Sequence, residues 1–158
     1  MQLIEVKSQE QKLRFYEHGL LLFEFLISTG KNGMGECQGS YQTPRGRHYI
    51  YEKIGQDLPY NTVFVNSLAT GEYYEPWMKQ AEPQRDWILT RILKLQGLES
   101  GKNLGGKVDT LARYIYLHGT SAEELLGVPA SKGCIRLHPQ DMMSLFDKVK
   151  VGAFVWIE

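Results

Sequence analysis

Two residues in the last third of the chain have the types and spacing of a thiol-dependent acyl-transfer site. Cys134 lies in the run Ser131-Lys132-Gly133-Cys134-Ile135-Arg136-Leu137, and His118 lies upstream of it. A cysteine becomes a nucleophile when its thiolate is stabilised and its sulfur is reachable. A histidine nearby can take the thiol proton. We therefore expect Cys134 to be the nucleophile and His118 its general base.

The residues beside Cys134 favour this chemistry. Gly133 allows a sharp backbone turn that leaves amide hydrogens free to hold an oxyanion. Lys132 and Arg136 place positive charge on both sides of the thiol, which favours the thiolate. The sequence thus predicts an activated cysteine.

The group that orients His118 is open at this stage. Asp109 and Asp141 are the side-chain candidates, and a backbone carbonyl serves equally well, because an imidazole N–H requires only an acceptor. His118 itself is expected at the end of a strand, where Gly119 leaves the ring room to reach a neighbouring loop.

The remaining cysteine and histidines have simpler interpretations. Cys37 has no activating charge beside it and is expected to be structural, and one pair of cysteines is no disulfide framework. No Cys-x-x-Cys element suggests zinc, and the covalent chemistry proposed here needs no metal or cofactor. His18 is expected in a hairpin turn, His48 in a strand and His138 at a helix N-terminus.

The elements that must position the site are mostly strands. Residues 11–28 alternate apolar and other residues around His18-Gly19, which predicts a β-hairpin. Residues 29–36 and 97–106 are glycine-rich and predict loops. Ser121-Ala122-Glu123-Glu124 has capping-box spacing, so a short helix should begin there and end at Gly127. Pro139 should begin an amphipathic helix. Further strands are expected at residues 48–54, 62–66, 87–95, 113–117 and 153–157.

These elements predict a mainly β domain spanning residues 1–158, a β-sandwich or partly closed barrel with two short helices near the C-terminus. Residues 73–85 are expected to be an ordinary loop rather than a flap over the site. Aromatic residues that are candidates to line a groove, though packing is their more common role, are Tyr51, Trp77, Trp87 and Tyr114.

Composition restricts the partners. Lys plus Arg number 18 and Asp plus Glu number 18, so no excess charge indicates binding to nucleic acid. No apolar run approaches the roughly 20 residues of a membrane span. The first residues lack the order of a signal peptide. We therefore expect a cytoplasmic protein if the chain is intact, and a periplasmic one if a leader has been removed.

Two separated segments together resemble the catalytic domain of L,D-transpeptidases (the YkuD-type family). The first contains His118-Gly119-Thr120, a spacer with Gly127, and the run from Ser131 to Leu137. The second contains Ser28-Thr29-Gly30 and Thr43-Pro44-Arg45-Gly46. The resemblance covers most of the chain. One departure is Lys132, where many members carry histidine.

The resemblance implies a β-rich fold and a peptidoglycan substrate. Cys134 would attack the carbonyl between an L-centre, typically of diaminopimelate, and D-Ala in a tetrapeptide stem. The amides of Gly133 and Cys134, with that of Lys132, would form the oxyanion hole, supported by Ser131 and Gly119. Arg136 would support the site or bind a substrate carboxylate.

The resemblance leaves the acceptor open. With no leader in view, we favour water and soluble muropeptides, which makes the protein an L,D-carboxypeptidase of muropeptide recycling. The alternatives are an L,D-transpeptidase that cross-links or exchanges D-amino acids in the periplasmic wall, and a non-catalytic wall-binding domain. A thiolate nucleophile also predicts covalent inhibition by carbapenem-type β-lactams.

Overall fold

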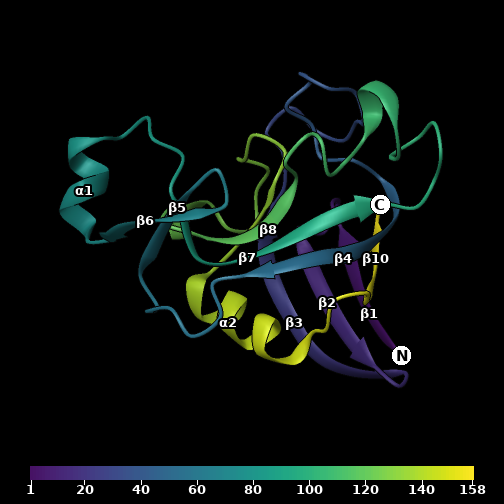
Figure 1. The fold of residues 1–158 in the computed structure, drawn as a ribbon, viewed down its shortest axis with the longest axis horizontal. Coiled ribbons are helices and arrows are strands. Elements are labelled where there is room, and N and C mark those ends of the chain that lie inside the picture. Colours follow the sequence, from purple (N-terminus) through teal and green to yellow (C-terminus); the bar gives the residue numbers. More distant parts are fainter.

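Ten strands form one sheet that closes on itself in the computed structural model, which describes residues 1–158 (Figure 1). The strands are β1 (Gln2–Lys7), β2 (Lys12–Glu17), β3 (Leu20–Ser28), β4 (Gly46–Ile54), β5 (Thr62–Val65), β6 (Leu68–Tyr73), β7 (Ile88–Gly97), β8 (Tyr116–Thr120), β9 (Ile135–Leu137) and β10 (Phe154–Ile157). The α-helices are α1 (Pro76–Ala81) and α2 (Pro139–Lys148), and single 3₁₀ turns lie at Gly106–Val108 and Glu123–Leu125. No helix is long and apolar enough to cross a bilayer.

Eight of the strands make the closed, barrel-like part. Their order is β4-β10-β1-β2-β3-β9-β8-β7, and pairing of β4 with β7 closes the circle. Two neighbouring pairs, β1–β10 and β8–β9, are parallel, and the others are antiparallel. The hairpin of β5 and β6 continues the sheet beyond β7, and α1 lies at its outer end, on the left in Figure 1. The mainly β fold and the barrel alternative are confirmed.

The core lies between the barrel strands and α2. His138 accepts a hydrogen bond from the Gln140 amide at the N-cap, and Pro139 follows at the first helical position, where its missing N–H costs nothing. The apolar stripe of α2 is fully buried against β7 and β8. Because α2 begins two residues after β9 ends, this helix anchors the strand that directly follows Cys134.

Most of the expected strands are confirmed. The hairpin turns at His18 and Gly19, both with positive φ, and the buried residues of β2 alternate as expected. Residues 29–36 and most of 97–106 are irregular, and the expected strands at 48–54, 62–66, 87–95 and 153–157 correspond to β4, β5, β7 and β10.

Three expectations were wrong in detail. The strand expected at residues 113–117 begins only at Tyr116, because Tyr114 takes φ 58° in a turn, and it extends through His118 and Gly119. The helix expected from Ser121 is one 3₁₀ turn without a side-chain cap. The loop expected at 73–85 contains α1, so only α2 of the two α-helices lies near the C-terminus.

Candidate active site

The parallel pairing of β8 with β9 brings the two candidate catalytic residues together. His118 lies opposite Arg136 in the register, and Leu117 lies opposite Ile135. Leu117 and Ile135 belong to the main core, so the alternating residues His118 and Arg136 belong to the other face. Cys134 precedes β9 and packs on that face against Tyr116. One sheet face therefore carries both the thiol and the imidazole.

His118 is fully buried and held in one orientation. Its Nδ1–H donates to the Gly119 carbonyl at 2.7 Å, which leaves the Nε2 lone pair free, and Nε2 has no partner. Burial lowers the pKa of His118, while the negative charge of Asp86 opposes that shift. The ring is thus neutral at neutral pH and able to accept a proton.

The backbone carbonyl is therefore the orienting group, and the two side-chain candidates were wrong. Asp109 accepts hydrogen bonds from the amides of Gly105 and Ala112, and Asp141 lies in the first turn of α2. Only glycine fits at position 119, because a Cβ there would lie 2.8 Å from the Leu89 carbonyl oxygen.

The thiol of Cys134 is protonated in the resting protein. Cys134 is half-buried, and its Sγ contacts the Tyr116 amide at 3.3 Å and the Tyr114 carbonyl at 3.4 Å. Burial raises the pKa of Cys134 to about 12, and the positive charges of Arg136 and Arg113 do not offset it. The expectation of a stabilised thiolate was wrong, because burial outweighs the nearby cations.

No hydrogen bond joins Cys134 to His118 in this resting arrangement. Proton transfer requires hydrogen-bond reach, and such contacts commonly tighten only when substrate binds. The structure thus describes a neutral thiol and a neutral imidazole on one sheet face, without a hydrogen bond between them.

This resting state has a measurable consequence. In a Cys37→Ser protein, which removes the exposed cysteine, iodoacetamide should alkylate Cys134 more slowly at pH 7 than it alkylates a free thiol. Because a raised pKa lowers the thiolate fraction, the rate should rise about tenfold per pH unit and reach no plateau below about pH 10. Mass spectrometry of the adduct against time measures this rate. Alkylation that is already fast at pH 6 and does not accelerate at higher pH would contradict the prediction.

The segment that carries Cys134 is fixed by its own hydrogen bonds. Ser131 Oγ donates to the Cys134 carbonyl at 2.5 Å and accepts from the Gly133 amide at 3.1 Å. Gly133 has φ +121°, and a Cβ there would lie 3.1 Å from both the Gln42 carbonyl oxygen and Ile115. The amides of Lys132 and Cys134 donate to no protein acceptor. Those two amides remain free, whereas that of Gly133 is already bonded to Ser131.

The upstream motif braces this segment from the other side. Thr43 Oγ1 donates to the Gly133 carbonyl at 2.8 Å and accepts from the Gly30 amide at 2.8 Å. The amides of Ala130 and Ser131 both donate to the Thr29 carbonyl at 2.9 Å. The two motifs that are distant in sequence are therefore one hydrogen-bonded unit around the cysteine.

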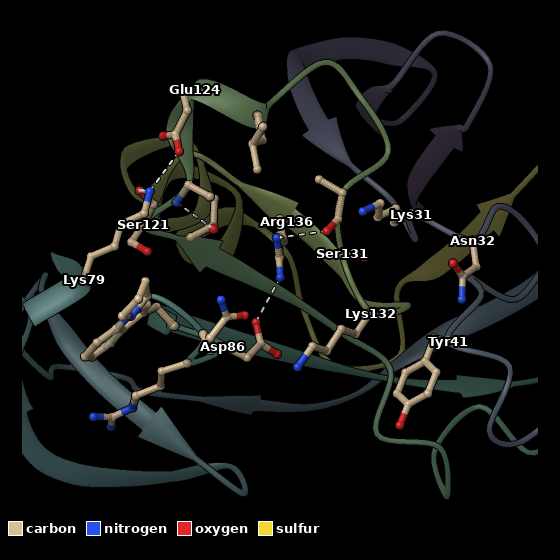
Figure 2. Close-up of a pocket in the computed structure, with 18 residues that line it drawn as sticks. Lys31, Asn32, Tyr41, Lys79, Asp86, Ser121, Glu124, Ser131, Lys132 and Arg136 are labelled. Atoms are coloured by element: carbon tan, nitrogen blue, oxygen red, sulfur yellow. Dashed lines mark hydrogen bonds and ion pairs between the residues drawn. The ribbon is translucent and has the colours of Figure 1, made fainter. Parts of the chain in front are cut away.

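Arg136 forms an ion pair with Asp86 at 3.0 Å on the floor of a cavity of about 550 Å³ (Figure 2). The Arg136 side chain is 13% exposed, and its Nε is buried without a partner. Figure 2 shows Lys31, Asn32, Tyr41 and Lys132 on one side of this pair and Lys79 with Glu124 on the other. Cavities of roughly 300–1,000 Å³ hold ligands of drug size, and this one falls within that range.

The other sequence candidates lie elsewhere or play structural roles. His18 is in the hairpin turn, and buried His48 bonds to Thr110 Oγ1 at 2.9 Å, as expected for core and turn histidines. Cys37, expected to be structural, is exposed. Of the four candidate aromatic residues, only Trp87 lines the cavity, and the other three are exposed: Tyr51, Trp77 and Tyr114.

Three contacts of the site had no signal in the sequence. Asp86 follows the segment expected to be a plain loop, and its partner Arg136 is far away in the chain. The bracing role of Thr43 depends on a contact with Gly133 across the fold. Arg113 ties the 35–42 loop to the site by donating to the Gln42 carbonyl at 2.6 Å. Each contact joins segments that only the closed sheet brings together.

The profile of the YkuD family, described as the L,D-transpeptidase catalytic domain, matches residues 1–157. The chain belongs to this family. A probable L,D-transpeptidase ErfK/SrfK of Salmonella typhimurium is 31% identical in an alignment 116 residues long, which covers 61% of this chain and 38% of that protein. The chain therefore spans well under half the length of this curated relative.

Solved L,D-transpeptidases share the fold. An L,D-transpeptidase from Mycobacterium smegmatis superimposes with a TM-score of 0.61 at 17% identity, covering 99% of this chain and 58% of that one. An L,D-transpeptidase solved in complex with imipenem gives a TM-score of 0.59 at 16% identity, covering 99% and 58%. At these identities the likeness establishes the L,D-transpeptidase fold alone.

Proposed function

We propose that this L,D-transpeptidase domain transfers acyl groups through a thioester on Cys134. The bond attacked is that between the L-centre of diaminopimelate and D-Ala in a peptidoglycan tetrapeptide stem. The observation that carries the proposal is the free Nε2 of buried, neutral His118 on the face that also carries Cys134. A buried imidazole with a fixed tautomer and an unused lone pair is suited to take a thiol proton.

Acylation begins with proton transfer from the Cys134 thiol to His118 Nε2. The sulfur attacks the carbonyl carbon, and the negative charge moves to the carbonyl oxygen, where the free amides of Lys132 and Cys134 are available as donors. When this intermediate collapses, the C–N bond breaks and the imidazolium gives its proton to the leaving amine. D-Ala departs, and a thioester remains on Cys134.

Deacylation reverses these proton movements. His118 takes a proton from the acceptor, the acceptor attacks the thioester carbonyl, and the C–S bond breaks. The sulfur recovers the proton from His118. With water as acceptor the product is a tripeptide carboxylate, and with an amine it is a new amide bond.

We infer that water is the main acceptor, so that the activity is that of an L,D-carboxypeptidase. The cavity of about 550 Å³ beside Arg136 suits one donor stem. Water needs no second binding surface, whereas a cross-linking acceptor needs room for another peptide. The L,D-transpeptidase reaction remains the second candidate, since the same thioester serves both.

A single incubation distinguishes the two acceptors. The protein is mixed with a soluble disaccharide tetrapeptide in ¹⁸O-labelled water, with and without an excess of D-methionine, and the products are read by mass. We expect D-Ala release and a tripeptide that carries ¹⁸O in its new carboxyl group. Predominant D-methionine exchange or dimer formation would assign the transpeptidase reaction instead.

Absence of any product would support the non-catalytic wall-binding alternative. Imipenem tests this directly, because a reactive Cys134 should form a covalent adduct that increases the protein mass by one inhibitor molecule. The solved relative in complex with imipenem motivates this probe. A protein that releases no D-Ala and forms no adduct is not the enzyme proposed here.

A further inference from the structure

The cavity beside Arg136, which Ser131 and Lys132 of the cysteine segment also line, carries more positive than negative charge, although the whole chain is neutral. Its lining contains two acidic residues, Asp86 and Glu124, against five basic ones: Lys31, Lys79, Arg85, Lys132 and Arg136. Three of the five are neutralised by ion pairs, Lys79 with Glu124, Arg85 with Glu72 and Arg136 with Asp86. The unpaired positive charge is therefore on Lys31 and Lys132.

The backbone holds these two lysines side by side. Gly30 and Ser131 form a parallel β-bridge, and the Lys31 amide donates to the Ser131 carbonyl at 2.8 Å. Lys31 directly follows Gly30, and Lys132 directly follows Ser131, so the two lysines occupy neighbouring positions on the two bridged segments. Segments paired in this way lie about 4.8 Å apart. Both side chains are exposed and make no ion pair or hydrogen bond. Adjacent like charges are unfavourable by themselves and become favourable when an anion lies between them.

We propose that Lys31 and Lys132 recognise a free carboxylate of the donor peptide and so select acidic stems over amidated ones. This inference rests on the proposed function, because the carboxylate would belong to the same stem peptide that the site is proposed to cleave. Lys132 lies two residues before Cys134, and the Gly30 amide is linked through Thr43 to the Gly133 carbonyl. The bound carboxylate therefore belongs to a residue next to the bond that is cleaved.

Two carboxylates of a tetrapeptide stem meet this condition. One is the side-chain carboxylate of diaminopimelate, and the other is the terminal carboxylate of D-Ala. Amidation of either group removes its charge while changing its shape little. A lysine ammonium is a compact charge without the fixed fork of arginine, so its selectivity depends mainly on the charge of its partner.

The experiment compares stems that differ only in this charge. Values of kcat/KM are measured for the free-acid tetrapeptide, for its diaminopimelate side-chain amide and for its D-alaninamide form. We expect kcat/KM for the free acid to exceed that for one of the amides by about tenfold. This factor corresponds to the low end of the contribution that a hydrogen bond to a charged group makes. The amide that loses activity identifies which carboxylate is bound.

Variants then locate the preference. Lys31→Gln and Lys132→Gln should each reduce the ratio of free-acid to amide kcat/KM, and the double variant should bring it close to one. Lys150→Gln is the matched control. It removes one exposed positive charge from a different cavity, which Met1 also lines, and should leave the ratio unchanged. Added salt should reduce the ratio in the wild type and have little effect in the double variant.

Binding is also measured by calorimetry in the Cys134→Ser background, so that the result does not depend on turnover. Equal affinity for acid and amide stems, or a ratio unchanged in the double variant, would overturn the lysine site. A tenfold binding preference without any D-Ala release would retain the lysine site and reject the catalytic proposal. The two failures are thus distinguishable.

Discussion

Replacing Cys134 with serine is expected to reduce D-Ala release from a tetrapeptide by on the order of 10⁴-fold, to background. A hydroxyl is far less acidic than a thiol, and His118, whose pKa is lowered by burial, is a weak base for it. The substitution is nearly isosteric at a half-buried position that already makes backbone contacts, so the fold should be retained. Quantifying free D-Ala with a coupled oxidase measures the effect.

The matched control is Cys37→Ser, which replaces the other, exposed cysteine. It should release D-Ala at the wild-type rate and should still form the imipenem adduct. Cys134→Ser should form no stable adduct, and peptide mapping of the wild type should place the added mass on the segment with Cys134. Wild-type activity in Cys134→Ser would eliminate the proposed mechanism.

Replacing His118 with glutamine is expected to lower the acylation rate by about 10²–10⁴-fold, the usual contribution of a positioned general base. Glutamine fills much of the space of the ring and can still donate to the Gly119 carbonyl, but its amide does not accept the thiol proton. Stopped-flow measurement of imipenem acylation isolates this step from deacylation.

The pH profile provides an independent readout for His118. In the wild type, acylation should fall as pH decreases through the folded-state pKa of His118, because a protonated ring accepts no proton. Burial lowers that pKa, so the fall should begin below about 6.5. His118→Gln should lose this acidic limb. A variant that keeps the acidic limb, or one of unchanged rate and melting temperature, would show that His118 is not the base.

The sequence predicted the elements whose patterns are local. The hairpin of β2 and β3 follows from period-two alternation around His18-Gly19, and α2 follows from Pro139 and its apolar stripe. β1 carried little signal, because only Ile4 and Val6 of its six residues are buried and its partner β10 lies at the opposite end of the chain. α1 is too short for helical periodicity and buries no side chain.

In the candidate site, too, the local features could be predicted from the sequence and the long-range contacts could not. Cys134, His118 and the glycine turn were recognisable because the motif keeps them within one stretch of chain. The Asp86–Arg136 pair and the Thr43 brace were not, since both depend on how distant strands pair. The protonation state of the thiol was predicted in the wrong direction, because neighbouring charges are visible in a sequence and burial is not.

The parallel pairing of β1 with β10 also constrains how the protein is made. Within this domain β1 is synthesised first and β10 last, yet β10 lies between β1 and β4 in the closed sheet. The edges of β1 and β4 that pair with β10 therefore stay open until residues 154–157 have been made, and such long-range closure is slow. We expect the barrel to close only after β10 has left the ribosome, with chaperones covering the open edges of β1 and β4 until then.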